Sequence, residues 1–165
     1  SQDSGWNLAS WITQSEEGRA FPMPTRNFSS STFEAVNDFT TQSLRRSFGP
    51  NPGSNLVGGE PERFVVRSGP FATDPRYGVL EMNGLNAVGP LTGTTDPAAV
   101  LKVLEICYRF GMDPESLGGT LAWAMEASEA GLLEYDLTFD DAPGAVQLAY
   151  SIATRSGIGN LSFQG

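Results

Sequence analysis

Three stretches in the second half of the chain carry apolar residues at helical spacing. The first begins after Asp96 and Pro97 and stops at Gly111. Between these limits one broad apolar face is formed by Val100, Leu101, Val103, Leu104, Cys107 and Phe110. Aspartate caps the exposed amides at a helix start, proline suits the first helical position, and glycine tolerates the left-handed conformation that ends a helix. The pattern predicts a helix from about Pro97 to Phe110.

A second helix is predicted to follow almost at once. Asp113 or Ser116 would cap its start, and Gly131 would end it. One stripe along it contains Leu117, Leu121, Met125 and Ser128. Gly118 and Gly119 lie just inside this helix, where each glycine costs about 1 kcal/mol relative to alanine. They indicate the close approach of either a neighbouring backbone or a cofactor.

A third helix is bracketed by Asp140 or Asp141 with Pro143 at its start and by Gly157 at its end. Its apolar positions are Val146, Ala149, Ile152 and Ala153. Because the connections between the three helices are short, they are predicted to pack as neighbours.

The first half of the chain contains fewer regular patterns. Ser31 and Glu34 have the spacing of a capping box, and the apolar residues that follow predict a helix ending near Arg46. Residues 48–62 are rich in glycine and proline and predict a long exposed loop. Residues 64–67, with the letters FVVR, form the one run that predicts a strand.

The predicted fold is therefore mainly α. Residues 1–20 are expected to be an N-terminal extension, and residues 21–165 a single multihelical domain with one short strand or hairpin and a long Gly/Pro-rich loop.

The composition of the chain excludes several kinds of catalytic and metal site and makes some partners unfavourable. The 10 basic and 19 acidic residues give a net charge of -9, which repels nucleic-acid phosphate and anionic lipid. Cys107 is the only cysteine and histidine is absent, which excludes His-based nucleophile triads and multi-thiolate metal sites built from this chain alone. No apolar stretch has the length of about 20 residues that spans a bilayer. We expect a cytoplasmic protein with neither a nucleic-acid nor a membrane partner.

Several short segments occur in an order found in one enzyme family. They are residues 21–28 (FPMPTRNF), 110–113 (FGMD), 119–126 (GTLAWAME), 131–133 (GLL) and 157–161 (GIGNL). In this order and at this spacing the chain resembles the second, helical domain of the tungsten-pterin aldehyde:ferredoxin oxidoreductases, whose members contain LPTRNF, GLDT, AMExxxxGLL and GIGxL.

The family's iron-sulfur loop has the pattern CxxCPxxC, but this chain has lost the thiols. Ser47, Pro50 and Ser54 lie at the 0, 3 and 7 spacing of a CxxCxxxC loop. A serine hydroxyl is a poor substitute for a thiolate, and proline has no side-chain donor. Two interpretations stay open, an ordinary surface loop or a degenerate cluster loop, and both predict that no cluster is bound.

The family's acidic segment GPEYET is also altered. It aligns with residues 74–78 (DPRYG), so Arg76 and Gly78 replace two glutamates. A guanidinium stays protonated in proteins and cannot act as a base. We therefore predict a structural turn here and assign no catalytic residue.

A cofactor-contacting motif is partly kept. The family's DxxGLD, whose aspartates accept hydrogen bonds from the pterin, corresponds to residues 108–113, where Tyr108 replaces the first acid and Asp113 keeps the last. The resemblance makes Gly111, Met112 and Asp113 the candidate cofactor-binding residues. An aspartate before proline is also an ordinary helix cap, and one carboxylate can serve both roles.

Two functions follow from these observations. The resemblance implies a fragment or accessory subunit of an enzyme that oxidises aldehydes to carboxylic acids and passes electrons to ferredoxin, inactive alone, with another domain or subunit of the family as its partner. No cofactor is expected in the isolated chain, whereas a tungsten-pterin is expected in the larger assembly. The alternative is a cofactor-free binding or scaffold domain that acts through protein-protein contacts, including those of Trp6, Trp11 and Trp123. On the first view, an apolar patch should be exposed where the missing domains dock.

Overall fold

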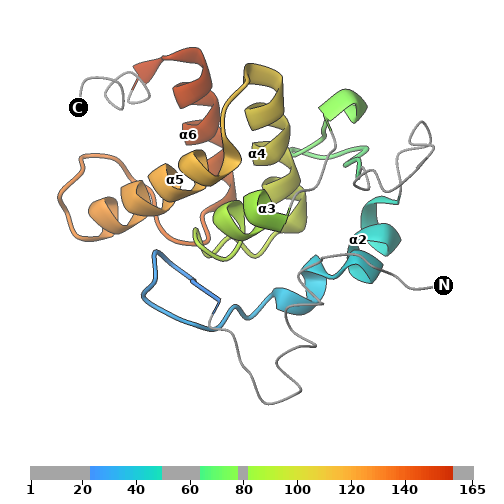
Figure 1. Cartoon of the computed structure of the whole chain (residues 1–165). Coiled ribbons are helices and arrows are strands. Elements are labelled where there is room, and N and C mark those ends of the chain that lie inside the picture. The colour runs from blue at the N-terminus through green and yellow to red at the C-terminus, as the bar shows by residue number, and fades with distance from the viewer. Residues whose placement is uncertain (1–22, 50–63, 78–81, 158–165) are drawn as a thin grey trace.

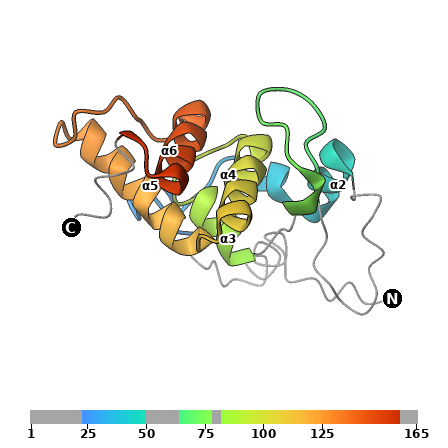
Figure 2. The ribbon, with the colours of Figure 1, turned by 90° about the horizontal axis from the view of Figure 1, so that it is seen from above.

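The computed structural model describes residues 23–49, 64–77 and 82–157. In these ranges the chain is mainly helical, as predicted. The elements in order are the 3-10 helix η1 (Val36–Phe39), α2 (Thr41–Phe48), the 3-10 helix η2 (Pro75–Tyr77), α3 (Met82–Val88), α4 (Pro97–Phe110), α5 (Pro114–Glu129) and α6 (Ala142–Thr154). Helices α3 to α6 group together, while α2 lies to one side (Figures 1 and 2). None of the described helices combines the length and apolar character needed to cross a membrane.

Helices α4, α5 and α6 begin at the aspartates that the sequence indicates. The carboxylate of Asp96 accepts a hydrogen bond from the amide of Ala98 at 2.8 Å. Asp113 and Asp141 cap α5 and α6 in the same way. Gly111 ends α4 in the left-handed conformation, with φ of 68°. The end of α6 differs from the prediction, because the helix ends at Thr154 and its left-handed cap is Arg155, two residues before Gly157.

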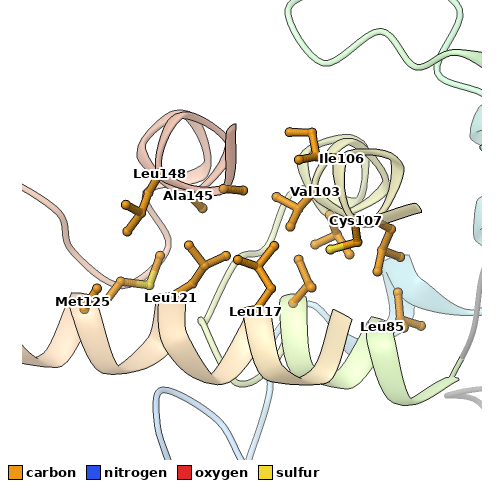
Figure 3. Packing of buried hydrophobic residues seen from close by; sticks show 14 of the residues in the cluster. Leu85, Val103, Ile106, Cys107, Leu117, Leu121, Met125, Ala145 and Leu148 are labelled. Carbon is orange, nitrogen blue, oxygen red and sulfur yellow. The ribbon is translucent and has the colours of Figure 1, made fainter. Parts of the chain in front are cut away.

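The main core lies between α5 and the pair α4 and α6. Leu117, Leu121 and Met125 project from one side of α5 toward side chains of α4 and α6 (Figure 3). Leu121 and Met125 have no exposed surface. This stripe is the one predicted from the sequence, and burying one such side chain stabilises the fold by about 1.5 to 3 kcal/mol.

Helix α3 was not predicted. Its residues Asn83, Gly84 and Asn86 are weak helix formers, so the local signal is poor. The helix forms where it packs against α5 and α4. At Gly118 of α5, an added Cβ would lie 2.4 Å from the carbonyl oxygen of Ala87 in α3. Close backbone packing thus explains Gly118, as one of the two interpretations predicted.

The predicted helix from Ser31 to Arg46 is wrong in its first half. Only η1 and α2 are helical there, and Thr40 between them is extended, with φ of -67° and ψ of 149°. Thr40 is the true cap, since its hydroxyl accepts a hydrogen bond from the amide of Ser43 at 3.1 Å. Glu34 does not close a capping box, because its carboxylate pairs with Arg26 at 2.5 Å.

The predicted strand at 64–67 is reduced to a single bridge position at Phe64. The amide of Val66 donates to the hydroxyl of Thr73, and the amide of Thr73 donates to the carbonyl of Val66, both at 2.9 Å. Phe64 and Val66 pack with Leu44 and Leu101 in a small second core. The segment is therefore anchored by burial and by a local loop. Most of the predicted Gly/Pro-rich loop, like residues 1–20, lies outside the described residues.

Candidate functional site

The turn between α4 and α5 contains all three residues predicted to contact a cofactor. The amides of Gly111 and Met112 both donate to the carbonyl of Cys107, the second at 2.8 Å. The side chain of Met112 packs partly against the main core. Asp113 follows as the cap of α5, and its Oδ2 accepts from the amide of Ser116 at 2.7 Å. The helix ends thus fix the backbone of this turn from both sides.

The Asp113 carboxylate is ionised at neutral pH. The hydrogen bonds from Ser116 lower its pKa below the ordinary value. A carboxylate has about four acceptor positions, so a group that caps a helix keeps the capacity to accept further N–H donors. The side chain can therefore act as a cap and as an acceptor for a ligand amine.

The surroundings of the turn are open and partly aromatic. A Cβ added at Gly111 would meet nothing within 4 Å. The exposed rings of Phe110 and Tyr150 pack edge to face with centroids 6.0 Å apart, and the guanidinium carbon of Arg109 lies 5.6 Å from the Phe110 ring centre. A flat ligand with N–H donors could approach this turn, which offers an acceptor carboxylate at Asp113 and an open backbone at Gly111 beside exposed aromatic rings.

The residues present fit the organic part of a pterin cofactor better than its metal. Among the residues that the structure describes, no group of three or more His, Cys, Asp or Glu could hold a metal ion. Tyr108, where the family has an acid, packs against the core. Ser47 lies in the last turn of α2, while Pro50 and Ser54 fall outside the described ranges.

The sole thiol is not available for chemistry in the folded chain. Cys107 is fully buried in the main core. Burial, followed by the nearby charge of Asp113, raises the pKa of the thiol to about 12. A thiol with so high a pKa stays protonated near neutral pH and is a poor nucleophile and metal ligand.

The segment aligned with the family's acidic motif forms a turn, as predicted. Pro75–Tyr77 is the 3-10 helix η2. The Arg76 guanidinium and amide donate to Asp74, and these hydrogen bonds lower the pKa of the half-buried Asp74 carboxyl to about 2. Arginine therefore serves a local ion pair here.

A strained hairpin is a second feature, to which the sequence analysis assigned no role. Thr25 and Ser30 pair as an antiparallel bridge. Between them Arg26, Asn27 and Phe28 all have positive φ, of 47°, 48° and 68°. Non-glycine residues in this conformation cost about 1 to 3 kcal/mol each and persist only where neighbouring groups fix them. The TRNF segment was the available signal, but it carries no local sign of this geometry.

Anchors on both sides hold the hairpin in place. The amide of Arg26 donates to the carbonyl of Pro90 at 3.0 Å, and the amide of Asn27 donates to that of Leu91 at 2.8 Å. The side-chain amide of Asn27 donates to the carboxylate of Glu126 in α5 at 2.5 Å. The Glu126 side chain is therefore a tertiary anchor of the hairpin.

The structure does not bring the hairpin and the turn together. Asp113 caps the start of α5, whereas Glu126 lies near its end. At 1.5 Å per residue, the 13 intervening steps separate them by about 20 Å along the helix. They are two distinct regions of one helix.

Comparison with known proteins agrees with this architecture and with the motifs. Residues 15–165 match the family described as aldehyde ferredoxin oxidoreductase, domains 2 and 3. The tungsten-containing aldehyde ferredoxin oxidoreductase of Thermococcus kodakarensis is 32% identical over 124 residues, which cover 73% of this chain and 19% of that protein. The Pyrococcus abyssi protein of the same name is 28% identical over 156 residues, which cover 86% of this chain and 24% of that protein. The chain thus spans about a quarter or less of the length of these relatives, and it belongs to the aldehyde ferredoxin oxidoreductase family.

Proposed function

We propose that this chain is a helical part of a tungstopterin aldehyde oxidoreductase and works within a larger assembly. The open turn with the ionised cap of Asp113 carries the proposal. Bound tungsten-pterin would supply the oxidation of an aldehyde to a carboxylic acid, with electrons leaving to ferredoxin. The chain's own residues would position the organic part of the cofactor.

The role of each residue follows from the geometry of the turn. Asp113 would accept hydrogen bonds from ligand N–H groups while it still caps α5. Gly111 leaves room for a ligand to approach the backbone. Met112 would hold the turn against the core. No group in this turn moves a proton or an electron.

The proposal includes a loop that has lost its cluster. Ser47, Pro50 and Ser54 offer no thiolate, so iron would have to be bound elsewhere in the assembly. A reducing, cytoplasmic location fits a chain whose single thiol is buried and unbridged.

A matched pair of cap variants tests the role of Asp113. Asparagine caps helices about as well as aspartate, so Asp113→Asn and Asp141→Asn should both fold with nearly unchanged stability. Only Asp113→Asn is expected to lower the pterin and tungsten content of the purified assembly, measured by pterin fluorescence and elemental analysis. Equal cofactor content in the two variants would show that Asp113 is a cap and nothing more.

A cofactor-free scaffold is the second candidate function. The observation in its favour is that Phe28 and Trp123 are 73% and 60% exposed, as in a chain that acts through contacts. A scaffold would copurify with its partner but without tungsten, molybdenum or pterin. Elemental analysis of the same preparation therefore separates the two functions.

A further inference from the structure

One face of helix α5 presents an exposed aromatic residue to solvent. Gly119, Trp123 and Glu126 recur at the i, i+4, i+7 spacing that places residues on one helix face. Trp123 is 60% exposed, and a Cβ at Gly119 would meet nothing within 4 Å. Packing within the described residues thus explains Gly118 but leaves Gly119 unexplained.

The hairpin extends this surface. It lies on the side of α5 away from the main core (Figures 1 and 3). The hydrogen bond from Asn27 to Glu126 ties its tip to the helix one turn beyond Trp123. Phe28, the next residue, is 73% exposed beside an open hollow of about 480 Å³ lined by Pro24, Phe28 and 29–31.

The strained conformation of the tip is fixed by hydrogen bonds. Three successive residues have positive φ, and backbone and side-chain hydrogen bonds hold them there. The result is an aromatic side chain directed to solvent. Strain retained at a fixed, exposed apolar residue indicates a surface shaped for contact.

We propose that this surface, comprising Asn27, Phe28, Gly119, Trp123 and Glu126, is where the remaining domain of the oxidoreductase docks, namely the domain outside the matched domains 2 and 3. This inference rests on the proposed function. The matched family region is domains 2 and 3, and the matched segments make up only 19% and 24% of two relatives, so most of the family fold lies outside this chain. Trp123 fills the role of a central anchor, since tryptophan is the residue type most enriched among interface hot spots.

The charge of α5 indicates what kind of surface the docking domain should present. Helix α5 contains Glu115, Glu126 and Glu129 and no lysine or arginine, in a chain of net charge -9. A partner with an apolar centre and a basic rim complements this helix, whereas a second copy of the chain would oppose acid to acid.

Photo-cross-linking tests the surface in cells that produce the full chain together with the remaining domain, on the same or a second polypeptide. The variants are Trp123→p-benzoylphenylalanine and Phe28→p-benzoylphenylalanine, both at exposed aromatic positions. The control is Gln42→p-benzoylphenylalanine, an exposed position of α2 on another part of the molecule (Figure 1). Mass spectrometry of the cross-linked peptides should show that the first two variants capture the remaining domain and that the control does not.

Other captures decide against the inference. Cross-links from Trp123 to a second copy or to residues 1–22 of the same chain, or no cross-link at all, would overturn it. Equal capture by the Gln42 variant would do the same. If the assembly contains tungsten, such results contradict the docking surface but not the proposed function. If the assembly contains neither tungsten nor pterin, the proposed function is contradicted whatever the cross-links show.

Affinity gives a second readout where the remaining domain is a separate polypeptide. Trp123→Ala should weaken its association by about 30-fold, the effect typical of a hot-spot residue. Gln42→Ala should leave it unchanged, and an unchanged dissociation constant for Trp123→Ala would contradict the proposal.

Discussion

Gly118 and Gly119 are neighbours in α5 whose surroundings differ completely. An added Cβ at position 118 would lie 2.4 Å from the carbonyl oxygen of Ala87, while at position 119 it would meet nothing within 4 Å. The sequence shows two adjacent glycines and gives no means of telling these roles apart. The pair is therefore a sensitive test of the α3–α5 packing.

Alanine substitutions should move stability in opposite directions. Gly118→Ala should destabilise the fold by about 1 to 3 kcal/mol, because α3 must shift to admit the methyl group. Gly119→Ala should stabilise it by about 0.5 to 1 kcal/mol, because alanine is the better helix former. Urea unfolding of the 165-residue chain measures both, and two changes of the same sign would count against the packing.

Because Cys107 is buried, the free energy of unfolding should depend on pH in the alkaline range. Its folded-state pKa is raised to about 12, whereas an unfolded thiol titrates near about 8.5. Between these values the unfolded chain loses the proton that the folded chain keeps, so the free energy of unfolding falls as pH rises, by up to about 1.4 kcal/mol per pH unit. Cys107→Ala should show a shallower fall between about pH 9 and 11, measured by denaturant unfolding. Parallel curves would mean that the thiol is not buried as described.

At the scale of elements, helices fixed by local interactions could be predicted from the sequence, and helices that depend on tertiary packing could not. Helices α4, α5 and α6 were predicted because their caps, Asp96, Asp113 and Asp141, act within three residues. Helix α3 was missed because it depends on packing against α5 and α4. Ser31 does not cap a helix because the first helical residue is Val36, and Glu34 pairs with Arg26, a contact that local spacing cannot reveal.

The position of the true cap can be checked directly. Thr40→Ala removes the acceptor for the Ser43 amide and should lower the free energy of unfolding by about 0.5 to 2 kcal/mol, with faster hydrogen exchange at Ser43. Ser31→Ala serves as the control and should change it by less than about 0.5 kcal/mol, as is usual for an exposed site without a cap. A larger effect at Ser31 would restore the predicted capping box.

The candidate site was predictable only in part for a related reason. Residues 111–113 could be named as candidates because one short motif survives there, and their turn forms as a local structure. The hairpin geometry could not, since its positive φ angles depend on Pro90, Leu91 and Glu126, far away in the sequence. The family match covers both regions but does not say which of their atoms meet a ligand.

At the scale of the whole molecule, the chain combines a well-built helical core with features suited to contacts outside it. The core between α3, α4, α5 and α6 consists of buried apolar side chains. Among the described residues, no group of His, Cys, Asp or Glu is suited to hold a metal ion. The turn at 111–113 lies at the start of α5, and the proposed docking surface around the exposed Trp123 lies toward its other end. These features fit the proposed function, in which the chain positions a cofactor that other parts of an assembly help to bind.

Elemental and pterin analysis of the native assembly, before and after this chain is separated from it, tests that account most directly. The account predicts tungsten and pterin in the intact assembly and neither in the separated chain. A native preparation in which the chain is a colourless monomer without tungsten, molybdenum or pterin would contradict it, as would a separated chain that retains the metal.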